Sequence, residues 1–294
     1  MSDQIIQIGQ LAINGVAVGA IYALIALGMV LTYKATEVLS FAHGDLLMFS
    51  TFVAWALIVG LGAPFWLAAL LTIALLALLA GLLEAGVMRR IVGQPQFASV
   101  LLTIALAFML RGATSMIFGP ESRSYPTPWT GQTVQLGPLV VNELSLVILA
   151  AAVVVTLVLF WFLRRTSLGV SVQAASQNQL AAFLCGIRVK RLNTLIWALS
   201  GALAALCGVL LAAITLVDTG LWIVLLKALA ALVLGGFGSI PGAIVGGLVI
   251  GLVEQFSGVY LMEGAKDIVS YVVLIGVLMV WPRGLLGEAS GRRV

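Results

Sequence analysis

The stretch LSLVILAAAVVVTLVLFWFL, from Leu144 to Leu163, carries no charged residue. An α-helix of about 20 apolar residues is long enough to cross the hydrocarbon core of a membrane, which is about 30 Å thick. Comparable apolar runs lie at about residues 8–33, 43–60, 64–88, 97–118, 192–217, 221–236, 238–258 and 265–282. The sequence therefore predicts an all-α polytopic membrane helix bundle with about eight to nine transmembrane segments.

The composition agrees with this class. Hydrophobic residues make up 62% of the chain, charged residues 9%, and the mean hydropathy is +1.18, whereas soluble domains are about one quarter charged. The net charge of +4 comes from basic residues in short loops, where they set membrane orientation, so no nucleic-acid partner is indicated. Cys185 and Cys207 lack the spacing of a metal site or a disulfide framework.

The basic residues also predict the topology. The polar interval 164–191 is rich in arginine and lysine, and such loops face the cytoplasm. Counting spans from there puts the N-terminus outside and the C-terminus in the cytoplasm, with the loop 119–138 outside and its Tyr125 and Trp129 at the membrane interface. We expect one membrane domain over residues 1–294, and no cleaved signal peptide, because no basic region precedes the first apolar run.

The stretch VLSFAHGDLLMF (Val38–Phe49) places the chain's single histidine beside glycine and aspartate. Ser40 is a plausible N-cap of the second membrane helix, and Asp45 suits the positive end of its dipole. Gly44 allows a close backbone approach or a local break. His43, expected near the cytoplasmic mouth, is a hydrogen-bonded structural residue, a gate residue or, least readily, a metal ligand, since metal sites need further His or Cys ligands.

Other polar groups inside apolar runs are candidate path or gate residues, because ionisable groups are costly in a membrane. Lys227 and Glu254 flank the stretch GGFGSIPG and either serve the path or neutralise each other. The glycines of that stretch mark either a helix interruption in a transport path or small-residue packing, as at Gly242 and Gly246. We expect Glu84 to pair with Arg89 or Arg90, and Arg111 with an acidic neighbour. The candidate path or gate residues are Asn14, Tyr22, His43, Gly44, Asp45, Lys227, Gly235, Gly236, Gly238 and Glu254.

The interval 164–191 contains good helix formers, which predicts a helix from about Val172 to Cys185, ended by Gly186. Its row Ala174, Gln177 and Ala181 has helical spacing. Such a helix either seats in a groove of a partner protein or is solvated without a partner.

Several separated motifs, in order, resemble the LivH-type permease subunits of branched-chain amino acid ABC transporters over residues 14–287. They include the run from Asn14 to Phe49, AAFLCGIRVKRLNTLIW from Ala181, and KALAALVLGGFGSIPGA from Lys227. The resemblance implies that the loop helix is a coupling helix that docks on an ATPase. One departure lies at Gln173, where relatives often carry arginine. The implied coupling residues are Gly169, Ala174, Gln177, Ala181, Ala182, Gly186 and Ile187.

The resemblance also implies the partners: two cytoplasmic ATP-binding subunits, a second permease of the LivM type, and an extracytoplasmic substrate-binding protein, in a bacterial inner membrane. The chain has no GxxxxGK[ST] phosphate-binding loop, so we expect ATP and Mg on the partner subunits, no cofactor in this chain and no enzyme activity. The expected cargo is a branched-chain or other hydrophobic amino acid. Alternatives are urea, amides or small organic acids, then a self-sufficient secondary transporter or channel, and last a membrane enzyme.

Overall fold

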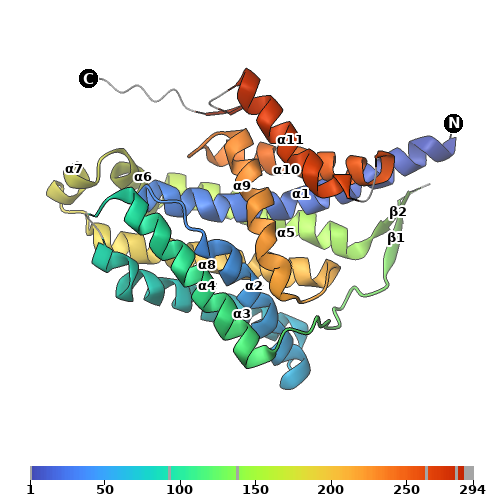
Figure 1. The fold of residues 1–294 in the computed structure, drawn as a ribbon, viewed down its shortest axis with the longest axis horizontal. Helices are drawn as coiled ribbons and strands as arrows, with labels where there is room; N and C mark the ends of the chain where they lie inside the picture. Colours follow the sequence, from blue (N-terminus) through green and yellow to red (C-terminus); the bar gives the residue numbers. More distant parts are fainter. Residues whose placement is uncertain (1, 92–93, 137–138, 262–263, 282–283, 288–294) are drawn as a thin grey trace. The chain divides into compact units, whose positions relative to one another are not determined.

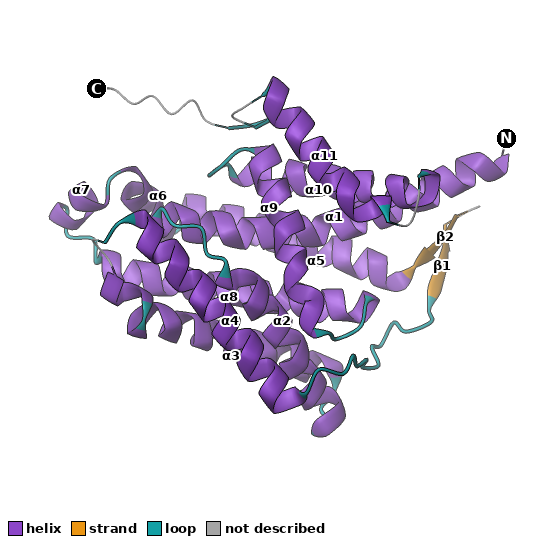
Figure 2. Cartoon of the chain, in the orientation of Figure 1, coloured by secondary structure: helices purple, strands orange, loops and turns teal. Residues whose placement is uncertain are grey.

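The computed structural model describes residues 2–91, 94–136, 139–261, 264–281 and 284–287, and most of them are helical (Figures 1 and 2). Seven helices of this described part are long and apolar enough to cross a membrane, which confirms the all-α polytopic class. They are α1 (Ser2–Thr36), α2 (Ala42–Trp55) with its π-helical continuation η1 (Ala56–Gly60), α3 (Phe65–Gly86), α4 (Gln96–Phe118), α5 (Glu143–Arg165), α8 (Val189–Ile214) and α10 (Ile240–Tyr260).

Two further apolar helices are shorter than a typical span. The 3-10 helix η3 (Thr219–Ile223) runs into α9 (Val224–Gly235), and α11 covers Ala265–Val280. The remaining elements are the 3-10 helix η2 (Met88–Ile91), the small helices α6 (Ser167–Gln177) and α7 (Gln179–Leu184), and a hairpin of β1 (Thr133–Leu136) and β2 (Leu139–Asn142). The hairpin pairs Val134 with Val141 in antiparallel register. Each strand has four residues, too few for an alternating pattern to predict it.

Contacts group the chain into two compact units. The first contains the residues up to Val30, Trp129–Val153 and the residues from Leu226 onward, and the second contains Leu31–Pro128 and Val154–Leu225. In the second unit α8 packs against α2 and α3, and α2 packs against α4. A Cβ at Gly208 would overlap Ser50 and approach the Leu47 carbonyl. Small residues allow such close packing, which is how helices associate in a lipid environment.

The first unit is packed on the same principle. A Cβ at Gly19 would lie 2.8 Å from the carbonyl oxygen of Gly247, so α1 and α10 touch through their backbones. Gly242 and Gly246 of α10 are pressed equally closely against Gly235 and Ala231 of α9. The predicted small-residue packing at Gly242 and Gly246 is therefore confirmed.

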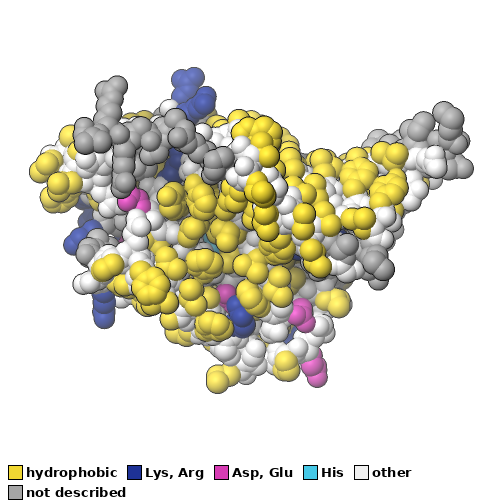
Figure 3. All heavy atoms as spheres, turned by 45° about the horizontal axis from the view of Figure 1, so that its top comes forward, with side chains coloured by type: hydrophobic (Ala, Val, Ile, Leu, Met, Phe, Trp, Pro, Cys, Tyr) yellow, Lys and Arg dark blue, Asp and Glu magenta, His cyan; other side chains and the backbone are white. Residues whose placement is uncertain are grey.

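Many large apolar side chains remain exposed on α3, α4 and α5, including Leu70, Leu78, Met116 and Trp161. The face drawn in Figure 3 is dominated by hydrophobic side chains with few charged ones between them. Exposed apolar surface of this extent suits lipid rather than water.

Candidate functional site

The predicted coupling segment forms two helices, so the prediction of one helix from about Val172 to Cys185 is wrong. Asn178 has an extended backbone (φ −159°, ψ 104°), and its side chain accepts a hydrogen bond from the Ala181 amide at 2.9 Å. Asparagine is a favoured N-cap residue, so it ends α6 and starts α7. Gly186 follows α7 with φ +87°, which suits the glycine predicted to end the helix.

The break at Asn178 separates the predicted coupling row, because Ala174 and Gln177 lie on α6 and Ala181 lies on α7. Burial separates the seven predicted residues further. Gly169 and Ala182 are buried, Ala174 and Ile187 are half-buried, and Gln177, Ala181 and Gly186 are exposed.

Gly169 contacts the chain's own α5. A Cβ there would overlap the Phe162 carbonyl and the Leu163 backbone, and the Thr166 hydroxyl caps α6 by accepting from the Gly169 amide at 3.0 Å. Only a glycine fits this turn between α5 and α6 without a shift of backbone. α7 instead exposes three large apolar side chains, Leu180, Phe183 and Leu184.

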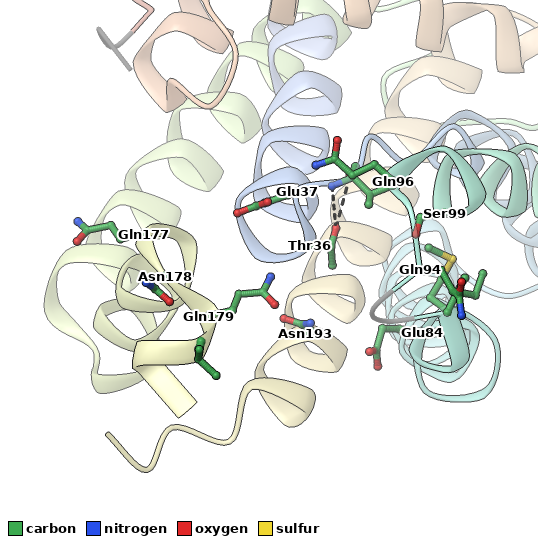
Figure 4. A pocket seen from close by; sticks show the side chains of 14 residues that line it. Thr36, Glu37, Glu84, Gln94, Gln96, Ser99, Gln177, Asn178, Gln179 and Asn193 are labelled. Atoms are coloured by element: carbon green, nitrogen blue, oxygen red, sulfur yellow. Dashed lines mark hydrogen bonds between the residues drawn. The ribbon is translucent and has the colours of Figure 1, made fainter. Parts of the chain in front are cut away.

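A cavity of about 460 Å³ lies beside the joint of α6 and α7. In Figure 4, Gln177, Asn178 and Gln179 border one side of it, and Glu84, Gln94 and Ser99 lie on the opposite side. The buried Oδ1 of Asn193, on α8, lines the cavity and has no hydrogen-bond partner within the described part of the chain. Glu37 borders it with φ +56°, a left-handed backbone that is uncommon for a residue with a side chain. The lining of this cavity comes from five separate segments, so no local sequence pattern predicts it.

The start of α2 is buried among its neighbours, and the expectation that His43 sits near the cytoplasmic mouth stays a prediction. The Phe41 amide donates to Oγ1 of Thr103 at 3.2 Å, and Thr103 lies about 10 Å along α4 from Gln96, at 1.5 Å per residue. Nδ1 of His43 lies 3.0 Å from Oγ of Ser200, about 17 Å along α8 from its first residue. The first turn of α2 therefore packs about one third of the way along α4 and about two fifths of the way along α8, counted from the first residue of each helix.

The N-cap of α2 is also not the predicted one. Phe41 occupies that position without a side-chain cap, and Ser40 contributes its backbone carbonyl to the His43 amide at 3.4 Å. Gly44 lies inside the helix, where a Cβ would be 2.7 Å from Cβ of Leu225 and 2.9 Å from the Trp222 carbonyl oxygen. Of the two alternatives predicted for Gly44, close approach is correct and a local break is wrong.

Asp45, in the same turn, forms a two-pronged ion pair with Arg111, as predicted for Arg111. Nε and Nη2 of the arginine donate to Oδ1 and Oδ2 of the aspartate at 2.9 and 3.1 Å. The aspartate side chain is 1% exposed and the arginine 23%. The guanidinium also lies over the Trp222 ring, 3.8 Å from its centroid, in a cation–π arrangement.

His43 is 1% exposed and makes its hydrogen bond to Ser200, while its Nε2 has no partner among the described residues. No group of three or more His, Cys, Asp or Glu side chains that could hold a metal ion occurs within the described ranges. The geometry thus fits the structural alternative for His43 and leaves its role as a gate residue a prediction.

A second charged cluster surrounds Glu254 of α10. Oε1 accepts from Nζ of Lys227 at 2.8 Å, Oε2 accepts from the Tyr22 hydroxyl at 2.7 Å, and Nζ of Lys266 lies 3.8 Å from Oε1. The predicted neutralisation of Lys227 by Glu254 is confirmed. Lys266 was not among the predicted residues, although its position at the start of the last apolar run could have indicated it. Asn14 is exposed whereas Tyr22 is buried, so the two residues do not share one environment.

The glycines between α9 and α10 form a tight turn. Gly236 and Gly238 have φ +107° and +80°, and Ser239 caps α10 by accepting from the Gly242 amide at 3.1 Å. The amides of Leu285 and Leu286 donate to the carbonyls of Leu234 and Gly235 at 2.8 and 2.9 Å. The C-terminal segment therefore satisfies carbonyls at the end of α9 that the helix itself leaves unpaired.

The last predicted pair, Glu84 with Arg89, is present at 3.1 Å, and Oγ1 of Thr194 donates to the same carboxylate oxygen at 2.5 Å. The chain thus combines many apolar helices, ion pairs inside the spans and a small amphipathic helix pair between two spans. These features define a polytopic membrane protein of the transporter class, in which buried charges are characteristic of functional spans.

Comparison with known proteins identifies the family. The family model described as "Branched-chain amino acid transport system / permease component" matches residues 11–278, and the chain belongs to this family. It is 30% identical to the high-affinity branched-chain amino acid transport system permease protein LivH of Escherichia coli, over the full length of both chains. It is 29% identical to BraD of Pseudomonas aeruginosa, over 97% of each chain.

A more distant relative is the galactofuranose transporter permease protein YtfT of Escherichia coli, which is 30% identical over 68% of this chain and 59% of its own. The chain is accordingly a permease subunit of an ABC importer in the inner membrane, and it is not an enzyme.

Proposed function

We propose that this chain forms part of the translocation path for branched-chain or other hydrophobic amino acids. The observation that carries the proposal is the family match over residues 11–278, together with full-length relatives named for branched-chain amino acid transport. A second, LivM-type permease completes the path, an extracytoplasmic binding protein delivers the cargo, and two cytoplasmic subunits bind ATP and Mg. The likeness to a galactofuranose permease makes cargo identity the first property to test.

In this proposal the ATPase subunits dock on the segment of α6 and α7 through the exposed side of α7. The support is the exposed apolar surface of α7 at Leu180, Phe183 and Leu184, because a small helix with apolar residues on one side suits a groove on a partner. The arginines and lysines at both ends of the segment support a cytoplasmic position for it. With the N-terminus outside and the C-terminus inside, the two shorter apolar helices complete an arrangement of eight to nine spans.

The path or gate includes the first turn of α2 and the Glu254 cluster. Both hold buried ionisable side chains inside apolar helices, where charges are costly and generally serve transport. The break between α1 and α2, after which the first turn of α2 is buried against α4 and α8, resembles the discontinuous helices that line the substrate sites of other transporters. Gly235, Gly236 and Gly238 contribute the tight turn that positions α9 and α10.

Reconstitution in lipid vesicles tests the proposal. The chain, a LivM-type partner, both ATPase subunits and the binding protein are combined, and uptake of leucine and of galactofuranose is recorded with and without ATP. We expect leucine uptake that requires every component and ATP. ATP turnover without leucine uptake would redirect the cargo assignment, and ATP-independent flux through this chain alone would overturn the importer mechanism.

Docking is tested in the same system. Ala181→Asp puts a charge on the exposed side of α7, and Ser167→Asp puts the same charge on the exposed first turn of α6. We expect the first variant to lose ATPase binding and the second to retain it. Equal binding by both variants would contradict docking through α7.

A further inference from the structure

The proposed docking helix α7 is tied to a distant helix by one glutamine. Nε2 of Gln179 donates to the carbonyl oxygen of Ala35 at 2.9 Å, across 144 residues of sequence. Ala182 is the one α7 residue that is buried, and the helix otherwise packs on α6 and α8. A helix of six residues held by so little apolar surface is positioned by its hydrogen bonds.

The acceptor belongs to the end of α1. The last four carbonyls of a helix have no partner within it. Here the Tyr33 carbonyl accepts from the Glu37 amide, and the Thr36 hydroxyl turns back to the Thr32 carbonyl, one residue before these four. The Ala35 carbonyl receives its hydrogen bond from Gln179. The side-chain amide of Gln179, on α7, thus caps the final turn of α1.

The chain beyond this cap leads directly to the start of α2. The chain turns at Glu37, which has a left-handed backbone conformation. The segment 38–41 follows, and at its end the Phe41 amide donates to Oγ1 of Thr103. The first turn of α2 follows, with Asp45 paired to Arg111. Only residues 37–41 separate the end of α1 from the start of α2, so a displacement of the last turn of α1 reaches the first turn of α2 through a short piece of chain.

We propose that Gln179 is a positioning residue that transmits movement of α7 to the end of α1 and hence to the first turn of α2. The inference rests on the proposed docking of ATPase subunits at α6 and α7. In the importer, closure of the ATPases moves α7, and the Gln179–Ala35 hydrogen bond makes the end of α1 move with it. Without this hydrogen bond, the ATPase subunits continue to hydrolyse ATP, but less of their movement reaches the first turn of α2, and less cargo is taken up per ATP.

A second glutamine provides a matched control. Nε2 of Gln173 donates to the carbonyl oxygen of Leu163, also at 2.9 Å. It has the same chemistry and length, but it ties α6 to the end of α5, which directly precedes α6 in the chain. Methionine has nearly the length of glutamine and no donor, so Gln179→Met and Gln173→Met each remove one such bond at little change of volume.

The experiment uses the complete reconstituted importer and measures leucine taken up per ATP hydrolysed. We expect Gln179→Met to keep ATP hydrolysis within about twofold of the wild type and to lose at least fivefold of the uptake per ATP. Gln173→Met stays within twofold on both measures. An unchanged ratio in Gln179→Met, or a proportional loss of hydrolysis and uptake, would overturn the proposal.

A cross-link distinguishes transmission from a structural role. Thr36 and Gln179 both border the cavity, so the pair Thr36→Cys and Gln179→Cys, in a background of Cys185→Ser and Cys207→Ala, is joined by a short bis-maleimide. We expect low uptake per ATP before cross-linking and recovery afterwards, because the covalent tie replaces the hydrogen bond. Continued loss after cross-linking refutes the inference. Absence of ATP-driven uptake in the wild-type complex would instead refute the proposed function itself.

Discussion

Replacing Arg111 by methionine leaves the Asp45 carboxylate, which is 1% exposed, without its ion-pair partner. Breaking a buried ion pair by removing one member costs about 3–5 kcal/mol, because an uncompensated charge stays in a poorly solvated site. Arg111 is 23% exposed, so we expect the lower end, about 3 kcal/mol. The lost stacking on Trp222 adds roughly 0.5–2 kcal/mol to the cost.

Removing both charges gives the opposite expectation. Exchange of a buried ion pair for neutral side chains is often neutral or stabilising, so the double variant Asp45→Asn with Arg111→Met recovers at least half of the stability that Arg111→Met alone loses. An exposed arginine provides the control, since Arg165→Met at the surface is expected to change stability by less than about 0.5 kcal/mol.

Thermal unfolding in lipid nanodiscs, followed by tryptophan fluorescence, measures these differences. A loss of 1 kcal/mol lowers the midpoint of a domain of 150–250 residues by about 2–4 °C. The two contributions together come to about 3.5–5 kcal/mol, so the midpoint of Arg111→Met is expected to fall by about 7–20 °C. A fall of less than about 2 °C, or a double variant less stable than Arg111→Met, would refute the argument that Asp45 depends on Arg111 for its charge compensation.

Three further changes test other contacts. Burial raises the pKa of Tyr125, whose hydroxyl donates to the Val209 carbonyl at 2.7 Å. Above about pH 10 the folded protein therefore keeps the Tyr125 proton that the unfolded chain loses. The free energy of unfolding then falls as the pH rises further, by up to about 1.4 kcal/mol per pH unit. Thermal unfolding midpoints measured between pH 9 and 11 check this. We expect the midpoint of Tyr125→Phe to fall less over this range than that of the wild type, and an equal fall in both proteins would contradict the argument. Lys227→Met removes the 2.8 Å partner of Glu254 and should cost about 3 kcal/mol of unfolding free energy, whereas an unchanged thermal midpoint would show that the lysine does not compensate the carboxylate. Glu37→Gly relieves a left-handed backbone that costs roughly 1–2 kcal/mol, so its midpoint in the same assay should rise, and a decrease would show that the Glu37 side chain stabilises the turn.

The sequence alone determined the class of this protein and most of its helices. A run such as Leu144–Leu163 specifies a spanning helix by its length and lack of charge, both of which are local properties. The coupling segment was located by the same reasoning, from its polarity between two apolar runs. Its break at Asn178 was missed because the helix-forming residues on both sides outweighed one capping residue in the pattern.

The tertiary structure decided which polar groups meet and at what depth. The sequence marked Asp45, Arg111, Lys227 and Glu254 as costly, but it could predict an acidic partner for Arg111 without naming Asp45, which lies 66 residues away. The burial of His43, which is 1% exposed, depends on contacts of its turn with distant helices, such as the hydrogen bond from the Phe41 amide to Thr103, and no local pattern predicts these contacts. Helices in lipid associate through backbone contact at small residues, as at Gly19 and Gly247. Their register therefore depends on the fit of surfaces from distant segments, a property that exists only once the chain is folded.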